Sequence, residues 1–273
     1  MTASAKQTSP ESSNPLLRLY VLDCGKISEI TSEEFGFDAN ELDSQMFTPC
    51  YLIVHSEGVL LWETGEIPDS EFADASTPVI KRSFSASRPL LPQLAEIGYT
   101  PADVTYLAMS HYHNDHVANA NLFAGSRWLV QRAEREAMFA TQLDQAKNGP
   151  IAPDRQFYGE LENSETTVIE NRDYDVFGDG TVVLKYTPGH TAGHQSLFVR
   201  LPETGPLLLS GDLYHYAEEL HREAQFVNHA SNDQTSISRR AMEAFVNEEG
   251  GEIWIQHDMS HATALKKSPD FYG

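Results

Sequence analysis

The chain has 273 residues, with 19 lysines and arginines against 40 aspartates and glutamates, and its formal net charge at pH 7 is -21. A chain of this length can bury a stable core without cross-links such as disulfides. So acidic a surface repels nucleic acids and anionic membranes, and we expect neither as a partner.

The first 15 residues, MTASAKQTSPESSNP, are polar and rich in serine and proline. They lack the apolar segment of a secretory signal, so we expect a disordered tail at 1–15 and a single folded domain at 16–273. No apolar stretch is long enough to cross a bilayer, which makes a cytoplasmic location the default expectation. Cys24 and Cys50 lie in separate hydrophobic segments, and we expect buried free thiols.

The first half of the chain mixes β-prone runs with amphipathic ones. These patterns predict strands at 16–25, 50–55, 59–62, 104–110 and 127–130, and helices at 89–98, 115–123 and 131–143. The segment 66–88 between them is irregular. A loop this long is often functional, and it is a candidate for a lid, a dimer contact, or both.

The second half is richer in strands. It predicts strands at 167–170, 175–177, 182–187, 195–201, 206–210 and 252–257, and an amphipathic helix at 236–249. The two halves have a similar order of elements. This order predicts two β-sheets packed together with helices outside.

The motif HYHNDH at 111–116 carries four candidate metal ligands in six residues. His111 and His113 are two residues apart, so in extended chain they share one side and can reach one ion. Asp115 and His116 begin the next turn and point elsewhere. The spacing therefore predicts two neighbouring ions, each short of ligands. A helix N-cap is the alternative role for Asp115 alone.

Further titratable side chains follow other strands at the point where each strand ends. They are His190 and His194 in YTPGHTAGH, Asp212 in LLLSGDLYHY and His257 in EIWIQHD. Loops that follow a rigid strand commonly carry functional groups. A structural histidine is the alternative interpretation for His257.

HYHNDH matches the HxHxDH signature of the metallo-β-lactamase-fold hydrolases, which the sequence resembles over essentially all of the chain after the tail. The segment TPGHTAGH, the aspartate of LLLSGD and the late histidine follow in the order typical of that family. The resemblance implies an α/β fold, an αββα sandwich of two mixed sheets with helices on the outer faces.

The resemblance also assigns the ligands by position. It places His111, His113 and His190 on the first ion, Asp115, His116 and His257 on the second, and Asp212 between both. Nitrogen and oxygen ligands without a thiolate suit two divalent ions, with Zn²⁺ preferred and Mn, Fe and Co as alternatives. His194 then supports the ligand loop.

Two such ions lower the pKa of a shared water, and the hydroxide formed attacks an ester carbonyl. Asp115 is a candidate proton shuttle to the departing group. Within the family, LYVLDCG, CYLIVHSEGVLLWETG and TPGHTAGHQSLFV look most like the quorum-quenching N-acyl-homoserine lactonases. This likeness implies that the protein opens a small-molecule lactone, and a homodimer is one expected state.

The chain departs from the lactonases at two positions. Its hairpin ends with Glu63 where an aspartate is more usual, and His215 stands where the lactonases often have a tyrosine three residues after the bridging aspartate. Tyr214 or His215 is the candidate catalytic contact to the substrate, with a packed aromatic as the alternative for Tyr214. Candidates for an apolar groove, with core packing as the alternative, are Met46, Phe47, Phe84 and Tyr112.

Several rival functions fit the sequence less well. A β-lactamase generally lacks the bridging aspartate, a glyoxalase-II-type thioesterase carries a further helical domain, and a nuclease needs a basic surface. A phosphotriesterase or another ester or lactone hydrolase of the same fold is the alternative enzyme. A non-enzymatic zinc scaffold is the alternative outside catalysis, although structural zinc sites are closed and hold a single ion.

Overall fold

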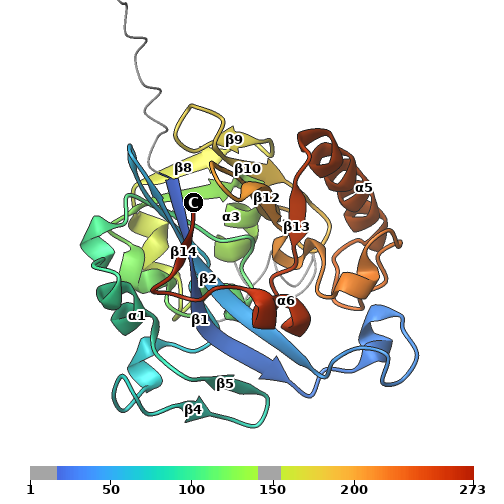
Figure 1. Cartoon of the computed structure of the whole chain (residues 1–273), viewed down its shortest axis with the longest axis horizontal. Helices are drawn as coiled ribbons and strands as arrows, with labels where there is room; N and C mark the ends of the chain where they lie inside the picture. The colour runs from blue at the N-terminus through green and yellow to red at the C-terminus, as the bar shows by residue number, and fades with distance from the viewer. Residues whose placement is uncertain (1–16, 141–154) are drawn as a thin grey trace, which may run out of the picture.

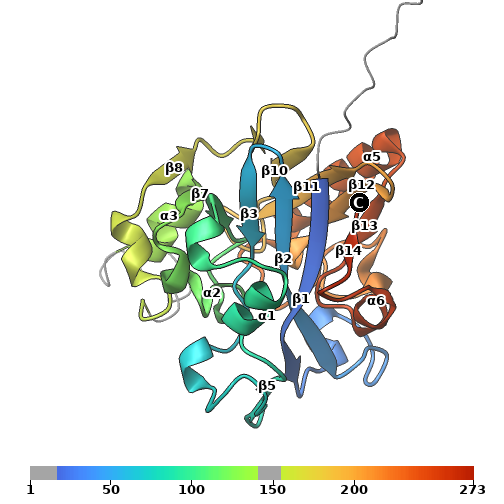
Figure 2. The same cartoon turned by 60° about the vertical axis from the view of Figure 1, so that its left-hand side comes forward.

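Two β-sheets packed face to face, with helices on their outer faces, form the structure. It is a computed structural model that describes residues 17–140 and 155–273. In Figure 2, which turns the view of Figure 1 by 60°, strands β1 to β3 run through the middle, with α1 and α3 on one side and α5 on the other. This arrangement confirms the predicted α/β class. The tail expected at 1–15 lies outside the described residues.

The first sheet has nine strands within the described residues, in the order β4-β5-β1-β2-β3-β6-β7-β8, with β14 paired to β1. The strands are β1 Leu17–Ser28, β2 Gln45–His55, β3 Gly58–Trp62, β4 Val79–Ile80, β5 Phe84–Ala86, β6 Tyr106–Ala108, β7 Arg127–Gln131, β8 Thr166–Ile169 and β14 Phe271–Tyr272. From β3 to β8 each neighbouring pair is parallel. Their carboxyl ends therefore meet at one edge of the sheet.

The second sheet has five strands in the described part of the chain, in the order β13-β12-β11-β10-β9. The strands are β9 Tyr174–Asp175, β10 Val182–Tyr186, β11 Gln195–Leu201, β12 Gly205–Leu209 and β13 Glu252–Trp254. β12 and β13 are parallel, whereas the other neighbouring strands of this sheet are antiparallel in the described residues, so the chain must cross over between β12 and β13. The long helix α5 lies on that crossover.

The α-helices in the described residues connect strands and cover the sheets. They are α1 Leu90–Glu96, α2 Asn114–Val117, α3 Arg132–Phe139, α5 Asn232–Glu249 and α6 Met259–Ala264. The helix predicted at 115–123 is two short pieces, α2 and a 3-10 helix at Ala120–Phe123. No helix among the described residues is long and apolar enough to cross a membrane.

Alternating apolar residues along β1 divide the core into layers. Leu19 and Val21 belong to the buried cluster between the two sheets. Tyr20 and Leu22 belong to the cluster between the first sheet and α1 and α3. Successive side chains of a strand point to opposite faces, so a central strand that is apolar throughout can bury both faces. A third cluster packs α5 on the second sheet.

The prediction that Cys24 and Cys50 are free thiols is wrong, because the two form a disulfide. They lie on β1 and β2, and the antiparallel pairing of these strands brings their Cα atoms to 5.8 Å, inside the range that a disulfide needs. Sequence patterns alone do not show which strands pair. Disulfides are rare in cytosolic proteins, so this bond does not favour the cytoplasmic location expected from the sequence.

The segment 66–88, predicted to be irregular, contains two short strands. β4 and β5 pair with each other, and β5 pairs with the far end of β1. The resulting hairpin projects from the lower edge of the molecule in Figure 1. Ile80 at its tip is 80% exposed.

Candidate metal centre

The HYHNDH motif occupies the tight turn that follows β6. Ala108 ends the strand, and His113 is the N-cap residue of α2, whose first turn carries Asp115 and His116. The change from strand to helix alters the direction of the side chains. His111 and His113 therefore face one point and Asp115 and His116 another, as the spacing predicted.

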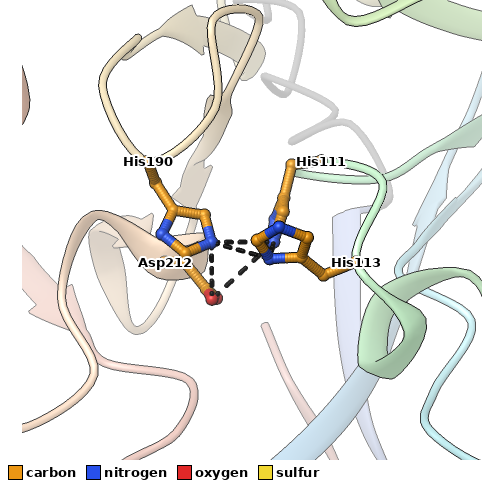
Figure 3. Close-up of side chains that lie close together, drawn as sticks. All are labelled: His111, His113, His190 and Asp212. Carbon is orange, nitrogen blue, oxygen red and sulfur yellow. Dashed lines mark hydrogen bonds and ion pairs between the residues drawn. The ribbon is translucent and has the colours of Figure 1, made fainter. Parts of the chain in front are cut away.

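His111, His113 and His190 direct ring nitrogens at one another (Figure 3). Nε2 of His111 lies 2.7 Å from Nδ1 of His113, and Nε2 of His190 lies 3.0 Å and 2.9 Å from these two atoms. A neutral imidazole has one N–H and one lone pair, so three converging nitrogens cannot all be satisfied by hydrogen bonds among themselves. Their geometry fits a shared cation.

Asp115, His116 and His257 form a second group beside the first. Nε2 of His116 lies 3.1 Å from Oδ2 of Asp115, and Nε2 of His257 lies 3.4 Å from the same oxygen. Nε2 of His116 is buried and makes no hydrogen bond within the described residues. Buried polar atoms rarely lack a hydrogen bond, and the two carboxylate oxygens beside Nε2 of His116 suit a cation that all three atoms would hold.

Asp212 connects the two groups. Its Oδ2 lies 3.2 Å from Nε2 of His190, and its Oδ1 lies 2.9 Å from Nε2 of His257 and 3.1 Å from Nε2 of His116. Each group therefore holds four potential ligand atoms within 4.8 Å of one another, and Asp212 belongs to both. The structure brings together all seven residues that the sequence predicted as ligands.

The electrostatics of the two groups also favour cations. Burial lowers the pKa of His111 and of His190 well below the usual value, which leaves neutral rings with a free lone pair. Burial alone would raise the pKa of Asp212, but the surrounding imidazoles, His257 first, hold it far below its ordinary range. Asp212 therefore stays a carboxylate, the form that binds metals.

Side chains behind the ligands fix their orientation. Glu63 accepts hydrogen bonds from the backbone N–H of Ser110, and its Oε1 lies 3.2 Å from Nδ1 of His116. Nε2 of His194 accepts the backbone N–H of Asp212 at 3.0 Å. Such partners hold a ligand's ring and tautomer in place. His194 thus contacts the backbone of Asp212, and it belongs to neither ligand group.

Glu134 of α3 makes hydrogen bonds to both the HYHNDH turn and the loop that follows His190. Its buried carboxylate accepts the backbone N–H groups of Tyr112 and Gly193 and the hydroxyl of Thr191. Burial raises the pKa of Glu134 to about 7. A Cβ on Gly193 would lie 2.2 Å from the Glu134 backbone nitrogen. Only glycine therefore permits this close approach of loop and helix.

The two candidate catalytic side chains lie in different places. Tyr214 donates its hydroxyl to Glu243 at 2.7 Å and packs in the core between α5 and the second sheet. Nε2 of His215 lies 3.2 Å from Oδ2 of Asp212. Burial disfavours the charged form of His215, but Asp212 and Glu219 outweigh burial and raise its pKa to about 9.

A cavity of about 750 Å³ opens over the centre. Its polar floor includes His113, Asp115, His190, Asp212 and His215, and one wall is apolar. The wall side chains are Ile27, Ile30, Phe35, Met46, Phe226 and Val227. Of the four residues predicted for an apolar groove, Met46 lines the cavity. Phe47 and Tyr112 pack in the core, and Phe84 is 38% exposed on β5.

Sequence reasoning missed His229, which lines the same cavity. Nδ1 of His229 lies 2.9 Å from Nδ1 of His190. Burial lowers the pKa of His229 to about 2. This histidine lies in FVNHASN, which follows no strand and matches no motif, so the sequence carried no signal that connected it with the ligands.

The model of the metallo-beta-lactamase superfamily matches residues 44–249. The chain belongs to this superfamily. Its predicted family resemblance is therefore confirmed, and the match spans the HYHNDH turn, the His190 loop and Asp212.

Two curated proteins are similar to the chain along most of its length. N-acyl homoserine lactonase AttM from Rhizobium radiobacter is 30% identical over 94% of this chain and 98% of its own sequence. An N-acyl homoserine lactonase from a Bacillus species is 31% identical over 81% of this chain and 85% of its own.

A solved structure has the same fold. It is an N-acyl homoserine lactone hydrolase with the product N-hexanoyl-L-homoserine bound at its catalytic metal centre. That structure is 25% identical in sequence, covers 93% of this chain and 98% of its own, and superposes with a TM-score of 0.74.

Proposed function

We propose that this protein is a metal-dependent lactonase that opens the ring of N-acyl homoserine lactones. The observation that best supports this proposal is the pair of candidate ligand groups that share Asp212 and lie below a cavity with one apolar wall. Polar floor and apolar wall match a molecule that has a reactive ester at one end and an acyl chain at the other. The relatives named as lactonases support the same substrate.

The seven side chains that converge on the cavity floor would hold two divalent ions, and we assign Zn²⁺ to them because imidazole and carboxylate ligands suit it. His111, His113 and His190 would hold one, Asp115, His116 and His257 the other, and Asp212 both. When bound, such ions lower the pKa of a water and polarise the ester carbonyl.

Asp115 is positioned to transfer a proton during the reaction. It lines the cavity and is the less buried of the two aspartates, with 13% of its side chain exposed against 5% for Asp212. Ring opening adds water to the ester carbonyl and breaks the bond to the ring oxygen, which takes up a proton. Asp115 would accept the proton of the attacking water and deliver it to this oxygen.

His215 would contact the substrate at the same floor. Its ring lies between Asp212 and the apolar wall, with centroid distances of 4.9 Å to Phe35 and 4.6 Å to Phe226. From this position an imidazole N–H can donate to a carbonyl oxygen of the bound ester. The hydroxyl of Tyr214 donates to Glu243 instead, so the Tyr214 side chain would contribute to the packing between α5 and the second sheet.

A panel of substrates tests the function. We expect the protein to release acid from N-acyl homoserine lactones, followed with a pH indicator, and to turn over a phosphotriester, a thioester and a β-lactam far more slowly. Turnover of the phosphotriester without any on lactones would overturn the lactonase proposal in favour of a phosphotriesterase. Absence of turnover on the whole panel, in protein loaded with zinc, would favour a binding protein.

Ile30 on the apolar wall should set the preference for acyl length. Each buried methylene contributes about 0.8 kcal/mol, or roughly fourfold in affinity. We expect Ile30→Ser to lower kcat/KM for a decanoyl lactone roughly tenfold more than for a butanoyl lactone, because in this proposal only the longer chain reaches Ile30. Ile237→Ser, at a 52% exposed site on α5, is the control and should change neither. Equal losses on both substrates would contradict the assignment.

A further inference from the structure

Gln256 lies where the ends of β3, β12 and β13 meet behind the candidate ligands. It is 2% exposed and directly precedes His257, in the turn between β13 and α6. Its side-chain oxygen accepts the indole N–H of Trp62 at 3.0 Å and the backbone N–H of Gly211 at 2.9 Å. Trp62 ends β3 in the first sheet, and Gly211 follows β12 in the second. A single carboxamide therefore connects the two sheets beside the centre.

These two hydrogen bonds fix the orientation of the carboxamide. An amide oxygen accepts hydrogen bonds, whereas an amide nitrogen donates them. Because two N–H groups point at Oε1 of Gln256, its Nε2 faces the other way, where Oε1 of Glu63 lies 3.5 Å from it. Glu63 is fully buried, and the same carboxylate oxygen lies 3.2 Å from Nδ1 of His116. The nitrogen of Gln256 thus faces the carboxylate that contacts a candidate ligand.

Gln256 is also connected to Asp212, through Gly211. Gly211 has a φ of +55°, and a Cβ there would lie 2.6 Å from Cβ of Ser110 and 2.8 Å from Nε2 of His194. The backbone can pass this close to Ser110 only because the residue is glycine. The next residue is Asp212, whose N–H donates to His194. Gln256 and His194 therefore hold two consecutive amides, and these fix the direction of the Asp212 carboxylate.

We propose that Gln256 is a positioning residue for the second ligand group. That group consists of Asp115, His116, His257 and the shared Asp212. The nitrogen of Gln256 faces Glu63, which contacts the ring of His116. Its oxygen holds the amide before Asp212, and its backbone leads into His257. The inference rests on the two-ion centre of the proposed function, and it is independent of the lactone substrate.

Gln256→Met tests this role. Methionine has a similar length but no amide, so Gly211 and Glu63 lose their partner. We expect chelator-treated wild-type protein to bind about two Co²⁺ ions per chain, in a titration followed by visible absorption. In Gln256→Met the affinity for one Co²⁺ should fall roughly 10- to 100-fold and its absorption bands should shift, as when a metal ligand loses its supporting partner. The affinity for the other Co²⁺ should change far less.

Gln93→Met is the matched control. Gln93 of α1 is also buried, at 3% exposed, and also uses both ends of its amide. Its oxygen accepts the N–H of Asp23 at 3.0 Å, and its nitrogen donates to the carbonyl of Asp23 at 2.8 Å. Both methionine variants should lower Tm, because each leaves a buried N–H group without its acceptor. Gln93→Met should nevertheless bind both Co²⁺ ions as the wild type does.

Two further variants separate the hydrogen bonds of Gln256 from the mere presence of a polar side chain. Gln256→Glu keeps an oxygen that can accept from Trp62 and Gly211, so it should recover part of the lost Co²⁺ affinity. Gln256→Asn keeps the amide but is one methylene too short to reach these donors, and it should recover none. If circular dichroism shows that Gln256→Met does not fold, the same titration of these two variants decides the role. Equal Co²⁺ affinities of Gln256→Glu and Gln256→Asn would overturn it.

The remaining outcomes distinguish this inference from the proposed function. Equal losses for both Co²⁺ ions in Gln256→Met, or the same losses in Gln256→Met and Gln93→Met, would overturn the positioning role. A wild type that binds one Co²⁺ yet opens lactones would overturn this inference alone. A wild type that binds two Co²⁺ but opens no lactone would refute the proposed substrate, while the variants would still decide the role of Gln256.

Discussion

Asp212→Asn should reduce lactone hydrolysis on the order of a thousandfold or more, the scale on which removal of one electrostatic stabiliser acts. Asp212 is the one residue that the two ligand groups share. An asparagine keeps the shape but removes the negative charge and one of the two anionic oxygens. The measurements are kcat/KM for an N-acyl homoserine lactone and the zinc content of the same preparation, which we expect to fall from about two ions per chain, as in two-metal hydrolases.

Asp233→Asn is the matched control for this prediction. Asp233 is exposed in the first turn of α5, and the same substitution there should leave activity and metal content within error of the wild type. The fold of Asp212→Asn can be checked by circular dichroism, since a misfolded variant would lose activity for a trivial reason. A folded Asp212→Asn that keeps wild-type activity would show that Asp212 does not bridge two ions.

Arg239→Leu should destabilise the protein by about 3–5 kcal/mol, the cost of leaving one partner of a buried ion pair alone. Arg239 of α5 is 1% exposed, and its guanidinium donates to Glu219 at 2.5 Å and to the carbonyl of Leu213 at 2.8 Å. Glu219 in turn accepts the backbone N–H groups of His215 and Tyr216. For a domain of this size the loss corresponds to roughly 6–20 °C in Tm.

Arg240, the next residue of α5, provides the control for the Arg239→Leu prediction. Arg240 pairs with Glu223 at 2.6 Å, but these side chains are 57% and 67% exposed, so Arg240→Leu should cost about 0–1 kcal/mol. The double variant Arg239→Leu/Glu219→Gln should recover part of the loss, because no unpaired charge then stays buried. Equal Tm values for Arg239→Leu and Arg240→Leu would contradict the argument.

The convergence of the candidate ligands could be predicted because its signal is local. The order of strand ends and the HYHNDH spacing, together with the family resemblance, indicated the seven residues that the structure brings together. The separation of Tyr214 from His215 could not be predicted. The two are adjacent in sequence, and only the short 3-10 helix at Gly211–Leu213 and the packing of α5 decide that His215 faces Asp212 while Tyr214 faces Glu243.

Pairings between distant segments were also beyond the sequence. The disulfide depends on the register of β1 against β2, and the contact between His190 and His229 depends on how the segment 226–231 docks on the Gly189 loop. The sequence by itself determined the layered fold and, with the family resemblance, the candidate ligands, because apolar periodicity and motif spacing act over a few residues. Tertiary structure alone decided which side chains stand behind the ligands, because that depends on contacts between residues far apart along the chain.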